Sequence, residues 1–310
     1  MSHLHDCIVV GGGAAGLSAA LVLGRARRDV LLVDAGEQSN RPAHAVGGLL
    51  AQESVAPGAL YTAGREQLGA YAAVTIRDGE VEAIEPHDDG TFRALLAGGA
   101  EAAARRVLLA TGMEYVPPDL PGVAERWGNA VFHCPFCHGW EVRDGALAVL
   151  GDGDAGVFRA LLLRGWSDDV VLLSGEVDDE ARAKLEAAGV PADDRQVVAV
   201  RDKATVVFAD GSELPRDGLL VPAPMRQRSP LAEALGLELA PGGTIVVDEL
   251  GRTSVPGVFA AGDVAGTVQM VPAAMGDGAR VAAQVRLSLV AEDHDLPFPP
   301  GAPTPSAAAR

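Results

Sequence analysis

Cysteine, positive charge and long apolar runs are all scarce in this 310-residue chain. Three cysteines cannot form a disulfide framework. Lysine and arginine total 25 against 42 aspartates and glutamates, and the net charge of −17 argues against nucleic acid or an anionic membrane surface as a partner. No apolar run reaches the roughly 18 residues of a membrane-spanning helix, and no leader segment is recognisable. We therefore expect a globular cytoplasmic protein, long enough for two domains.

A first repeat unit combines a strand, a glycine-rich turn, a helix and a second strand. The apolar run CIVV (Cys7–Val10) leads into GGGAAG, in which Gly11, Gly13 and Gly16 match the G-x-G-x-x-G fingerprint. Those glycines permit a tight turn, close approach of a pyrophosphate to the helix N-terminus, and close packing of helix on strand. Asp34 follows Gly11 by 23 residues and ends the second strand, where a carboxylate accepts hydrogen bonds from a ribose. The pattern predicts a dinucleotide site.

The same pattern returns in the middle of the chain. ALAVL (residues 146–150) precedes GDGDAG, with glycines at 151, 153 and 156, and a helix-like run and the strand-like DVVLLSGE follow. Two such folds in one chain indicate a flavoprotein with a nicotinamide partner domain. The predicted fold class is α/β, with two Rossmann-like dinucleotide-binding domains.

Two later segments are assigned to the first fold. RRVLLATG (Arg105–Gly112) reads as a buried strand that ends in a glycine turn. TSVPGVFAAGDVAG (Thr253–Gly266) would bring Gly262 and Asp263 close to the ribityl chain and phosphates of a flavin. The helix-like run after it would point its N-terminus at the flavin ring.

The motif FHCPFCHGW, residues 132–140, holds the other two cysteines. On a helix that begins near Cys134, Cys137 and His138 share one face with it, so the two thiols can bond to each other. Pro135 is tolerated in the first helical turn. A helix N-terminus favours a thiolate, and His138 can take and return a proton near neutral pH. The motif predicts a redox-active pair.

Two other interpretations of the pair are weaker. A structural zinc site draws its ligands from two separated segments, and the sequence has no second C-x-x-C. A purely structural disulfide would stabilise little over so short a loop. No resident metal ion is therefore expected. Cys7 is assigned to the core as an inert thiol, Phe136 and Trp140 to the core or a pocket wall, and His133 is either a second catalytic histidine or a packing residue.

Across nearly its whole length the chain resembles the low-molecular-weight thioredoxin reductase group of FAD proteins. The resemblance implies an FAD-binding domain from residues 1–116 and 244–298, an inserted NAD(P)-binding-like domain from 117–243 that carries the cysteine pair, and a disordered tail at 299–310. It also implies that Cys137 lies next to the flavin while Cys134 exchanges with substrate, and that the enzyme is a homodimer.

One departure from the group concerns the second nucleotide motif. Reductases of the group that use NADPH carry a His-Arg-Arg run that grips the 2′-phosphate, and Ser174-Gly175-Glu176 stand at that offset here. The run VDDE (177–180) follows, so a 2′-phosphate would meet carboxylates, which repel it. NADPH is not expected as the reductant. NADH stays open, because Glu176 would accept a hydrogen bond from its 2′-hydroxyl.

CPFCHGW resembles the motif of the dithiol oxidase branch, the gliotoxin- and holomycin-type enzymes. That resemblance implies oxidation of a small-molecule dithiol by the cysteine pair and FAD, with O₂ reduced to H₂O₂. The alternatives are an NAD(P)H-dependent reductase of thioredoxin-like proteins and a low-turnover flavin redox sensor or interaction protein. The predicted catalytic residues are Cys134, Cys137, His138 and His133. The predicted FAD-binding residues are Gly11, Gly13, Ala14, Ala15, Gly16, Asp34, Ala35, Arg41, His44, Val81, Ala110, Thr111, Gly112, Gly262, Asp263, Gln269, Met270 and Val271.

Overall fold

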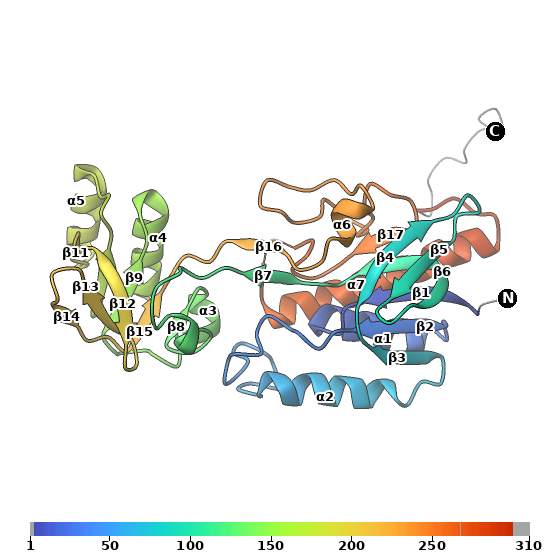
Figure 1. Cartoon of the computed structure of the whole chain (residues 1–310), viewed down its shortest axis with the longest axis horizontal. Coiled ribbons are helices and arrows are strands. Elements are labelled where there is room, and N and C mark those ends of the chain that lie inside the picture. The colour runs from blue at the N-terminus through green and yellow to red at the C-terminus, as the bar shows by residue number, and fades with distance from the viewer. Residues whose placement is uncertain (1–2, 267, 300–310) are drawn as a thin grey trace. The chain divides into compact units, whose positions relative to one another are not determined.

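A computed structural model describes residues 3–266 and 268–299 and divides the chain into two compact units (Figure 1). The first unit consists of the described parts of Met1–Ser39, Gly58–Glu114 and Met225–Arg310. The second unit consists of Asn40–Pro57 and Tyr115–Pro224. The tail that the sequence predicted beyond residue 299 lies outside the described residues.

Two segments group differently from the sequence-based domain bounds. Residues 40–57 belong to the second unit, where the side chain of Asn129 accepts a hydrogen bond from the His44 N–H and donates one to the Pro42 carbonyl. Residues 225–243 belong to the first unit, because Leu231 and Leu237 are buried in its core. The family resemblance implied a domain boundary between residues 243 and 244, but burial of these leucines places the preceding stretch in the first unit.

The first unit is built on a seven-stranded sheet in the order β3-β2-β1-β6-β5-β4, with β17 beside β6. Strands β1, β2, β3, β6 and β17 run parallel, whereas β4 and β5 are antiparallel additions. The bounds are β1 Leu4–Val10, β2 Val30–Asp34, β3 Val74–Asp78, β4 Val81–Pro86, β5 Phe92–Leu96, β6 Ala100–Leu109 and β17 Val258–Ala260. The strands predicted around CIVV, DVLLVDAG, RRVLLATG and GVFAAG are all present.

Apolar side chains cover both faces of this sheet, which explains why its strands read as continuous apolar runs. Alternate residues of β1 enter different clusters: Cys7 and Val9 face one, Ile8 and Val10 the other. Gly278 permits close helix packing, because a Cβ there would overlap the backbone of Ala15. The helices of this unit are α1 Ala14–Arg25, α2 Pro57–Leu68, α6 Leu231–Ala234 and α7 Val271–Asp293.

The second unit contains a five-stranded parallel sheet in the order β11-β10-β9-β15-β8 and a three-stranded antiparallel sheet, β12-β13-β14. Its strands are β8 Val131–Phe132, β9 Leu147–Leu150, β10 Val170–Leu173, β11 Ala192–Asp193, β12 Val197–Arg201, β13 Thr205–Phe208, β14 Glu213–Leu214 and β15 Gly218–Leu220. Its helical segments are the 3₁₀ turn Ala124–Arg126, α3 Pro135–His138, α4 Gly153–Leu163 and α5 Asp179–Ala187. The predicted second strand–helix–strand repeat is therefore formed by β9, α4 and β10.

Two short strands, β7 (Met113–Tyr115) and β16 (Met225–Gln227), pair with each other in a separate sheet. Among the residues that the structure describes, no helix has the length and apolar character that crossing a membrane requires.

Candidate active site

The glycine loop of the first unit folds against the end of β6. Gly11 has a φ of +104°, and a Cβ there would overlap the backbone of Ala110. Gly16 is equally restricted, because a Cβ there would overlap the Gly11 carbonyl. Gly13 is the N-cap residue of α1, and the nearest atom to a Cβ there would be Gln38 Cγ at 3.7 Å. The loop therefore forms a cradle that can admit a phosphate at the N-terminus of α1.

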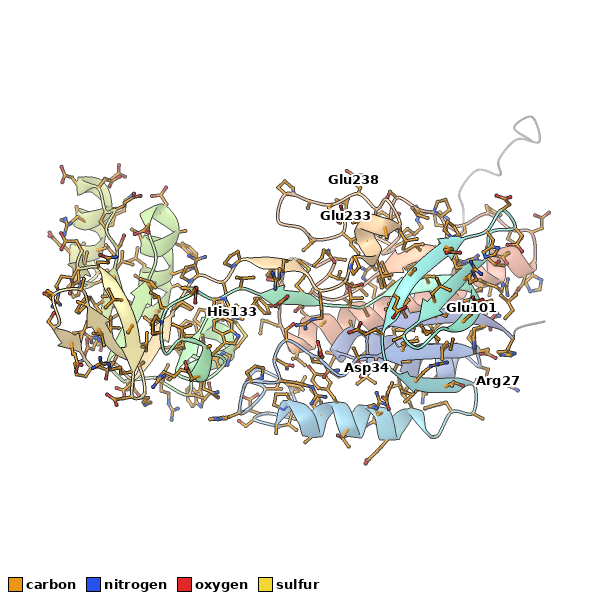
Figure 2. All side chains as sticks on the ribbon, viewed as in Figure 1. Arg27, Asp34, Glu101, His133, Glu233 and Glu238 are labelled. Atoms are coloured by element: carbon orange, nitrogen blue, oxygen red, sulfur yellow. A yellow bond between two sulfur atoms is a disulfide. The ribbon has the colours of Figure 1, made fainter. Side chains whose placement is uncertain are left out.

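Asp34, labelled in Figure 2, lies beside this cradle at the end of β2 and is 6% exposed. Its Oδ1 accepts hydrogen bonds from the N–H groups of Gly12 (3.0 Å) and Gly36 (3.1 Å). Its Oδ2 accepts one from the Arg65 guanidinium at 3.1 Å. These contacts orient the carboxylate at the position where the fingerprint places a ribose.

The ends of β6 and β17 meet the same loop. Ala110, Thr111 and Gly112 directly follow β6. Gly262 follows β17, and its φ of +79° and close approach to Ala15 leave room for glycine alone. The Gly262 N–H donates to Asp277 Oδ2 on α7 at 2.8 Å, which ties the strand end to that helix. Since parallel strands end at one edge, these segments and the glycine loop form one surface that fits a dinucleotide such as FAD.

The remaining predicted cofactor residues are distributed as follows. Val81 is 7% exposed and packs in the apolar core of the first unit. Arg41 and His44 belong to the second unit, on residues 40–57. The other predicted residues lie at the same edge as the glycine loop, directly before α7 or at its first position: Ala14, Ala15, Ala35, Asp263, Gln269, Met270 and Val271.

Cys134 and Cys137 are joined as a disulfide, with their Cα atoms 5.3 Å apart. Cys134 is the N-cap residue of α3, Pro135 occupies the first helical position, and the Cys137 N–H donates to the Cys134 carbonyl at 3.2 Å. The helix that the sequence predicted here is a single turn of four residues. Because four peptide dipoles sum to a small field, the N-terminus of so short a helix stabilises a thiolate less than that of a longer helix would.

His138 is half-buried behind the cysteine pair. Its Nε2–H donates to the Gly128 carbonyl at 2.9 Å, so the proton of the neutral ring lies on Nε2 and the lone pair on Nδ1. Nδ1 is buried and has no hydrogen-bond partner among the described residues. Burial lowers the pKa of His138, with the Gly128 carbonyl, the Glu141 carboxylate and the backbone of Cys134 acting in the opposite direction. The ring is thus neutral at neutral pH and has one free acceptor atom.

His133, labelled in Figure 2, stacks between two aromatic rings. Its ring centroid is 4.1 Å from that of Tyr115 and 5.4 Å from that of Trp127. Burial, and secondarily the charge of His138, lowers the pKa of His133 to about 4. Of the two roles that the sequence left open, the geometry favours packing, because an imidazole with so low a pKa is a weak base at neutral pH.

Two aromatic residues of the motif are not core residues. Phe136 is 60% exposed and Trp140 63% exposed, with the Arg143 guanidinium 3.9 Å above the Trp140 ring. Of the two positions expected for them, the core is excluded and the pocket wall stays a prediction. Phe136 also packs edge-on against Trp166. Their exposure gives the cysteine motif an apolar flank within the second unit.

Residues 42–47 cover the other side of the cysteine motif. A Cβ at Gly47 would come within 2.8 Å of the Cys137 carbonyl oxygen. Asn129 holds the Pro42–His44 turn, and Gly128, its neighbour, accepts the His138 hydrogen bond. Sequence reasoning missed Gly128 and Asn129. The Gly-Asn pair signals a turn, but nothing in it indicates that the turn orients a histidine ten residues further on.

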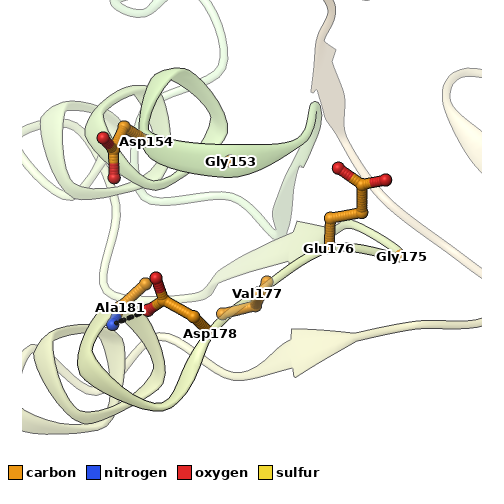
Figure 3. A pocket seen from close by; sticks show the side chains of 7 residues that line it. All are labelled: Gly153, Asp154, Gly175, Glu176, Val177, Asp178 and Ala181. Atoms are coloured by element: carbon orange, nitrogen blue, oxygen red, sulfur yellow. Dashed lines mark hydrogen bonds between the residues drawn. The ribbon is translucent and has the colours of Figure 1, made fainter.

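The second glycine loop is held by hydrogen bonds to other residues of the second unit. The Gly153 N–H donates to the Glu176 carbonyl at 3.3 Å, and the Ser174 hydroxyl donates to Asp152 Oδ1 at 2.8 Å. A hollow of about 440 Å³ beside the loop is lined by Gly153, Asp154, Gly175, Glu176, Val177, Asp178 and Ala181 (Figure 3). Three of these lining residues are acidic and none is basic. The hollow therefore has the wrong charge for a nucleotide phosphate.

Comparison with known proteins agrees with this architecture. Residues 5–278 match the family model described as pyridine nucleotide-disulphide oxidoreductase. Thioredoxin reductase tcpT of Claviceps purpurea is 35% identical, over 89% of this chain and 92% of the relative. The crystal structure of HlmI has a TM-score of 0.87 at 40% identity and covers 94% and 95% of the two chains. An oxidoreductase from Agrobacterium tumefaciens has a TM-score of 0.88 at 37% identity, covering 93% and 99%.

The chain is a disulfide oxidoreductase, and it belongs to the pyridine nucleotide-disulphide oxidoreductase family. Within that family it is a thioredoxin reductase-like FAD flavoprotein, and its resemblance to the dithiol oxidase branch is confirmed. The predicted α/β class with two Rossmann-like domains is also confirmed.

Proposed function

We propose that the protein is an FAD-dependent dithiol oxidase that forms a disulfide in a small-molecule dithiol, with O₂ as the electron acceptor and H₂O₂ as the second product. The observation that carries the proposal is the acidic, self-closed second glycine loop, where a reductase would hold NADPH. Without NADPH as an electron donor, electrons would enter the enzyme through the cysteine pair. The exposed rings of Phe136 and Trp140 suit a small organic dithiol.

The chemistry at the pair balances as a dithiol–disulfide exchange. One substrate thiolate attacks Cys134 Sγ, the Cys134–Cys137 bond breaks, and Cys137 leaves as a thiolate. The second substrate thiolate then attacks the substrate sulfur of the mixed disulfide and releases Cys134 as a thiolate. The substrate has lost two electrons and two protons. The cysteine pair has gained the two electrons, and the released Cys134 thiolate takes up one of the protons. Assignment of the attacked sulfur to Cys134 follows the family resemblance.

His138 would receive one of the two substrate protons. Its Nε2–H is engaged with the Gly128 carbonyl, so Nδ1 is the acceptor, and burial keeps the ring neutral and ready at neutral pH. The Gly128 carbonyl then stabilises the imidazolium, because its hydrogen bond to Nε2–H strengthens when the ring becomes charged. Asn129 and the Pro42–His44 turn would hold Gly128 and the cysteine motif in place.

FAD would be held in the first unit by the glycine loop, Asp34, Ala110–Gly112, Gly262 and Asp263, and when bound it supplies the two-electron acceptor that returns the cysteine pair to the disulfide and reduces O₂. We propose residues 1–116 and 244–298 as the FAD-binding domain and 117–243 as the inserted domain, adjusted at residues 40–57 and 225–243 as described above. Thioredoxin reductase-like relatives are typically homodimers, and we propose the same assembly here.

Anaerobic reduction tests the proposal. The purified enzyme should be yellow, should bleach on mixing with an excess of a small dithiol, and should regain its colour in air with one H₂O₂ per dithiol oxidised. NADPH should leave it yellow over minutes. Cys134→Ser is the control, since it retains the FAD site but lacks the sulfur that the substrate attacks. Rapid bleaching by NADPH would overturn the oxidase in favour of a conventional reductase.

One observation favours a second candidate, an NADH-dependent disulfide reductase. Glu176 lines the hollow of the second unit, where a carboxylate accepts hydrogen bonds from an unphosphorylated ribose. Bleaching by NADH alone, abolished in Glu176→Ala, would select this candidate. A flavin that neither nucleotide nor dithiol bleaches would select a redox sensor instead.

A further inference from the structure

Two histidines and an aspartate converge at the start of β1, in the first unit. His3 directly precedes the strand and His5 lies within it, while Asp29 directly precedes β2. His3 Nε2 is 2.6 Å from Asp29 Oδ2, and His5 Nδ1 is 2.5 Å from Asp29 Oδ1. One nitrogen or oxygen of each side chain lies within 4.8 Å of the others. The cluster is at the opposite end of β1 from the glycine loop, about 20 Å away along a seven-residue strand.

The backbone holds the carboxylate of this cluster in position. The Asp29 carbonyl accepts hydrogen bonds from the N–H groups of Asp6 (2.9 Å) and Cys7 (3.2 Å), and the Asp29 N–H donates to Asp6 Oδ2 at 3.1 Å. Arg28, the preceding residue, pairs with Asp6 and Asp293. These hydrogen bonds fix the backbone of Asp29 on both sides, so the oxygen ligand of the cluster is pre-oriented.

We propose that His3, His5 and Asp29 form a binding site for a divalent transition metal ion of the Zn²⁺ class. Imidazole nitrogens select Zn²⁺, Ni²⁺ or Cu²⁺ over Mg²⁺ and Ca²⁺, which prefer oxygen ligands alone. With metal–ligand distances of about 2.0–2.2 Å, neighbouring ligand atoms in a tetrahedron lie about 3.3–3.5 Å apart. That spacing is between the hydrogen-bond distances seen here and 4.8 Å, so small side-chain rotations suffice.

Three protein ligands leave further coordination positions to water, as in open zinc sites. The net charge of −17 favours cation binding in general. A metal ion was not expected from the sequence, in which Asp29 lies 24 residues after His5 and far from the cysteine motif. A bound ion would join the start of β1 to the residue directly before β2.

The test uses the full-length FAD enzyme in its oxidised form, so that the disulfide removes Cys134 and Cys137 as competing ligands. After chelator treatment, Zn²⁺ is titrated by calorimetry, and Co²⁺ is followed by its visible difference spectrum. We expect one equivalent of high-affinity binding. Since loss of a group that merely orients a ligand costs about 10–100-fold in affinity, His5→Ala and Asp29→Asn should each weaken binding by at least about 100-fold.

Two variants keep the test decisive. His3 is 67% exposed, so His3→Ala should fold normally and still weaken binding. His87→Ala removes an exposed histidine outside the cluster and should leave the titration unchanged. Flavin content of every variant reports folding. Absence of a stoichiometric equivalent in the native enzyme, or equal binding by the native enzyme and all three cluster variants, would leave only a hydrogen-bonded His–Asp–His group and overturn the proposal.

Discussion

The two glycine loops of this protein share their spacing but differ in charge. Gly16 and Gly156 play the same packing role, since a Cβ at either would overlap the carbonyl of the first glycine of its own loop. Beside the first loop, the Asp34 carboxylate is balanced by Arg65. Beside the second, Asp154 and two further acids line the hollow, and among its lining residues no base offsets them. The glycine fingerprint therefore indicates how the helix packs on the strand, whereas the charges of the surrounding side chains indicate whether the loop suits a nucleotide phosphate.

The largest expected effect removes His138, the proton acceptor that we propose for the cysteine pair. His138→Ala should slow dithiol oxidation by about 10²–10⁴-fold at neutral pH and recover in part at high pH, where the substrate thiol ionises unaided. Because burial lowers the pKa of His138, the native rate should hold to pH values below the ordinary histidine pKa of about 6.5 and fall only under them. Stopped-flow pH profiles measure both. An unchanged rate would return His138 to a packing role.

The next largest effect concerns FAD binding after substitution of the first glycine in each of the two loops. Gly11→Ala places a side chain at φ +104° against the Ala110 backbone, and such strain costs about 1–3 kcal/mol, so FAD affinity should fall up to about 100-fold. Gly151→Ala meets its nearest atom at an ordinary 3.4 Å and should keep its FAD. Flavin absorbance per protein, with circular dichroism as a check on folding, measures both. Equal flavin loss in the two variants would contradict the proposal that the first glycine loop, and not the second, holds FAD.

A third effect concerns acid stability of the second unit. The pKa of His133 is lowered to about 4, so this histidine contributes full stability above its unfolded pKa of about 6.5, and the contribution is lost as pH falls towards 4. The loss should reach about 3 kcal/mol. His133→Phe should remove this part of the acid sensitivity, as measured by denaturant midpoints at pH 7 and 4.5. His87→Phe, which replaces an exposed histidine, is the control; if both variants follow the native pH profile, His133 is not a buried neutral ring.

The smallest expected effect comes from adding a positive charge beside the second glycine loop. Glu176→Arg replaces a repulsive charge by an attractive one at the hollow, which should strengthen NADPH binding about tenfold, as measured by nucleotide fluorescence. Glu186→Arg makes the same change of charge on an exposed site of α5 outside the hollow. If the two variants gain equally, net charge and not the hollow governs nucleotide affinity.

Much of the fold could be predicted because its strands and glycine turns are recognisable from short stretches of neighbouring residues. The apolar runs at β1, β2, β9 and β10 identified both repeats, because Gly11 directly follows β1, Gly151 directly follows β9 and Asp34 ends β2. The packing of residues 40–57 on the cysteine motif could not be predicted, because it depends on one side chain, Asn129, that bonds across 85 residues of sequence. The tautomer of His138 likewise depends on a backbone carbonyl, which no residue type encodes.

The sequence predicted where α3 begins but not how long it is. Cys134, Pro135, Cys137 and His138 have the spacing and the first-turn proline of a helix start, and the helix ends after one turn at His138. One helical turn is enough to bring Cys134 and Cys137 within disulfide distance. The spacing of the motif therefore predicted that the two cysteines could pair, but not the length of the helix or the strength of its dipole.

The hydrogen bonds that close the second glycine loop also bear on how the enzyme persists in a cell. A ligand raises the unfolding free energy only of the fold that it binds. Asp152, Ser174 and Glu176 satisfy that loop internally, so the second unit needs no nucleotide to complete it. Under the proposed function, starvation for reduced nicotinamide would leave the enzyme intact, whereas starvation for the flavin precursor would expose it to proteolysis from the first unit onward.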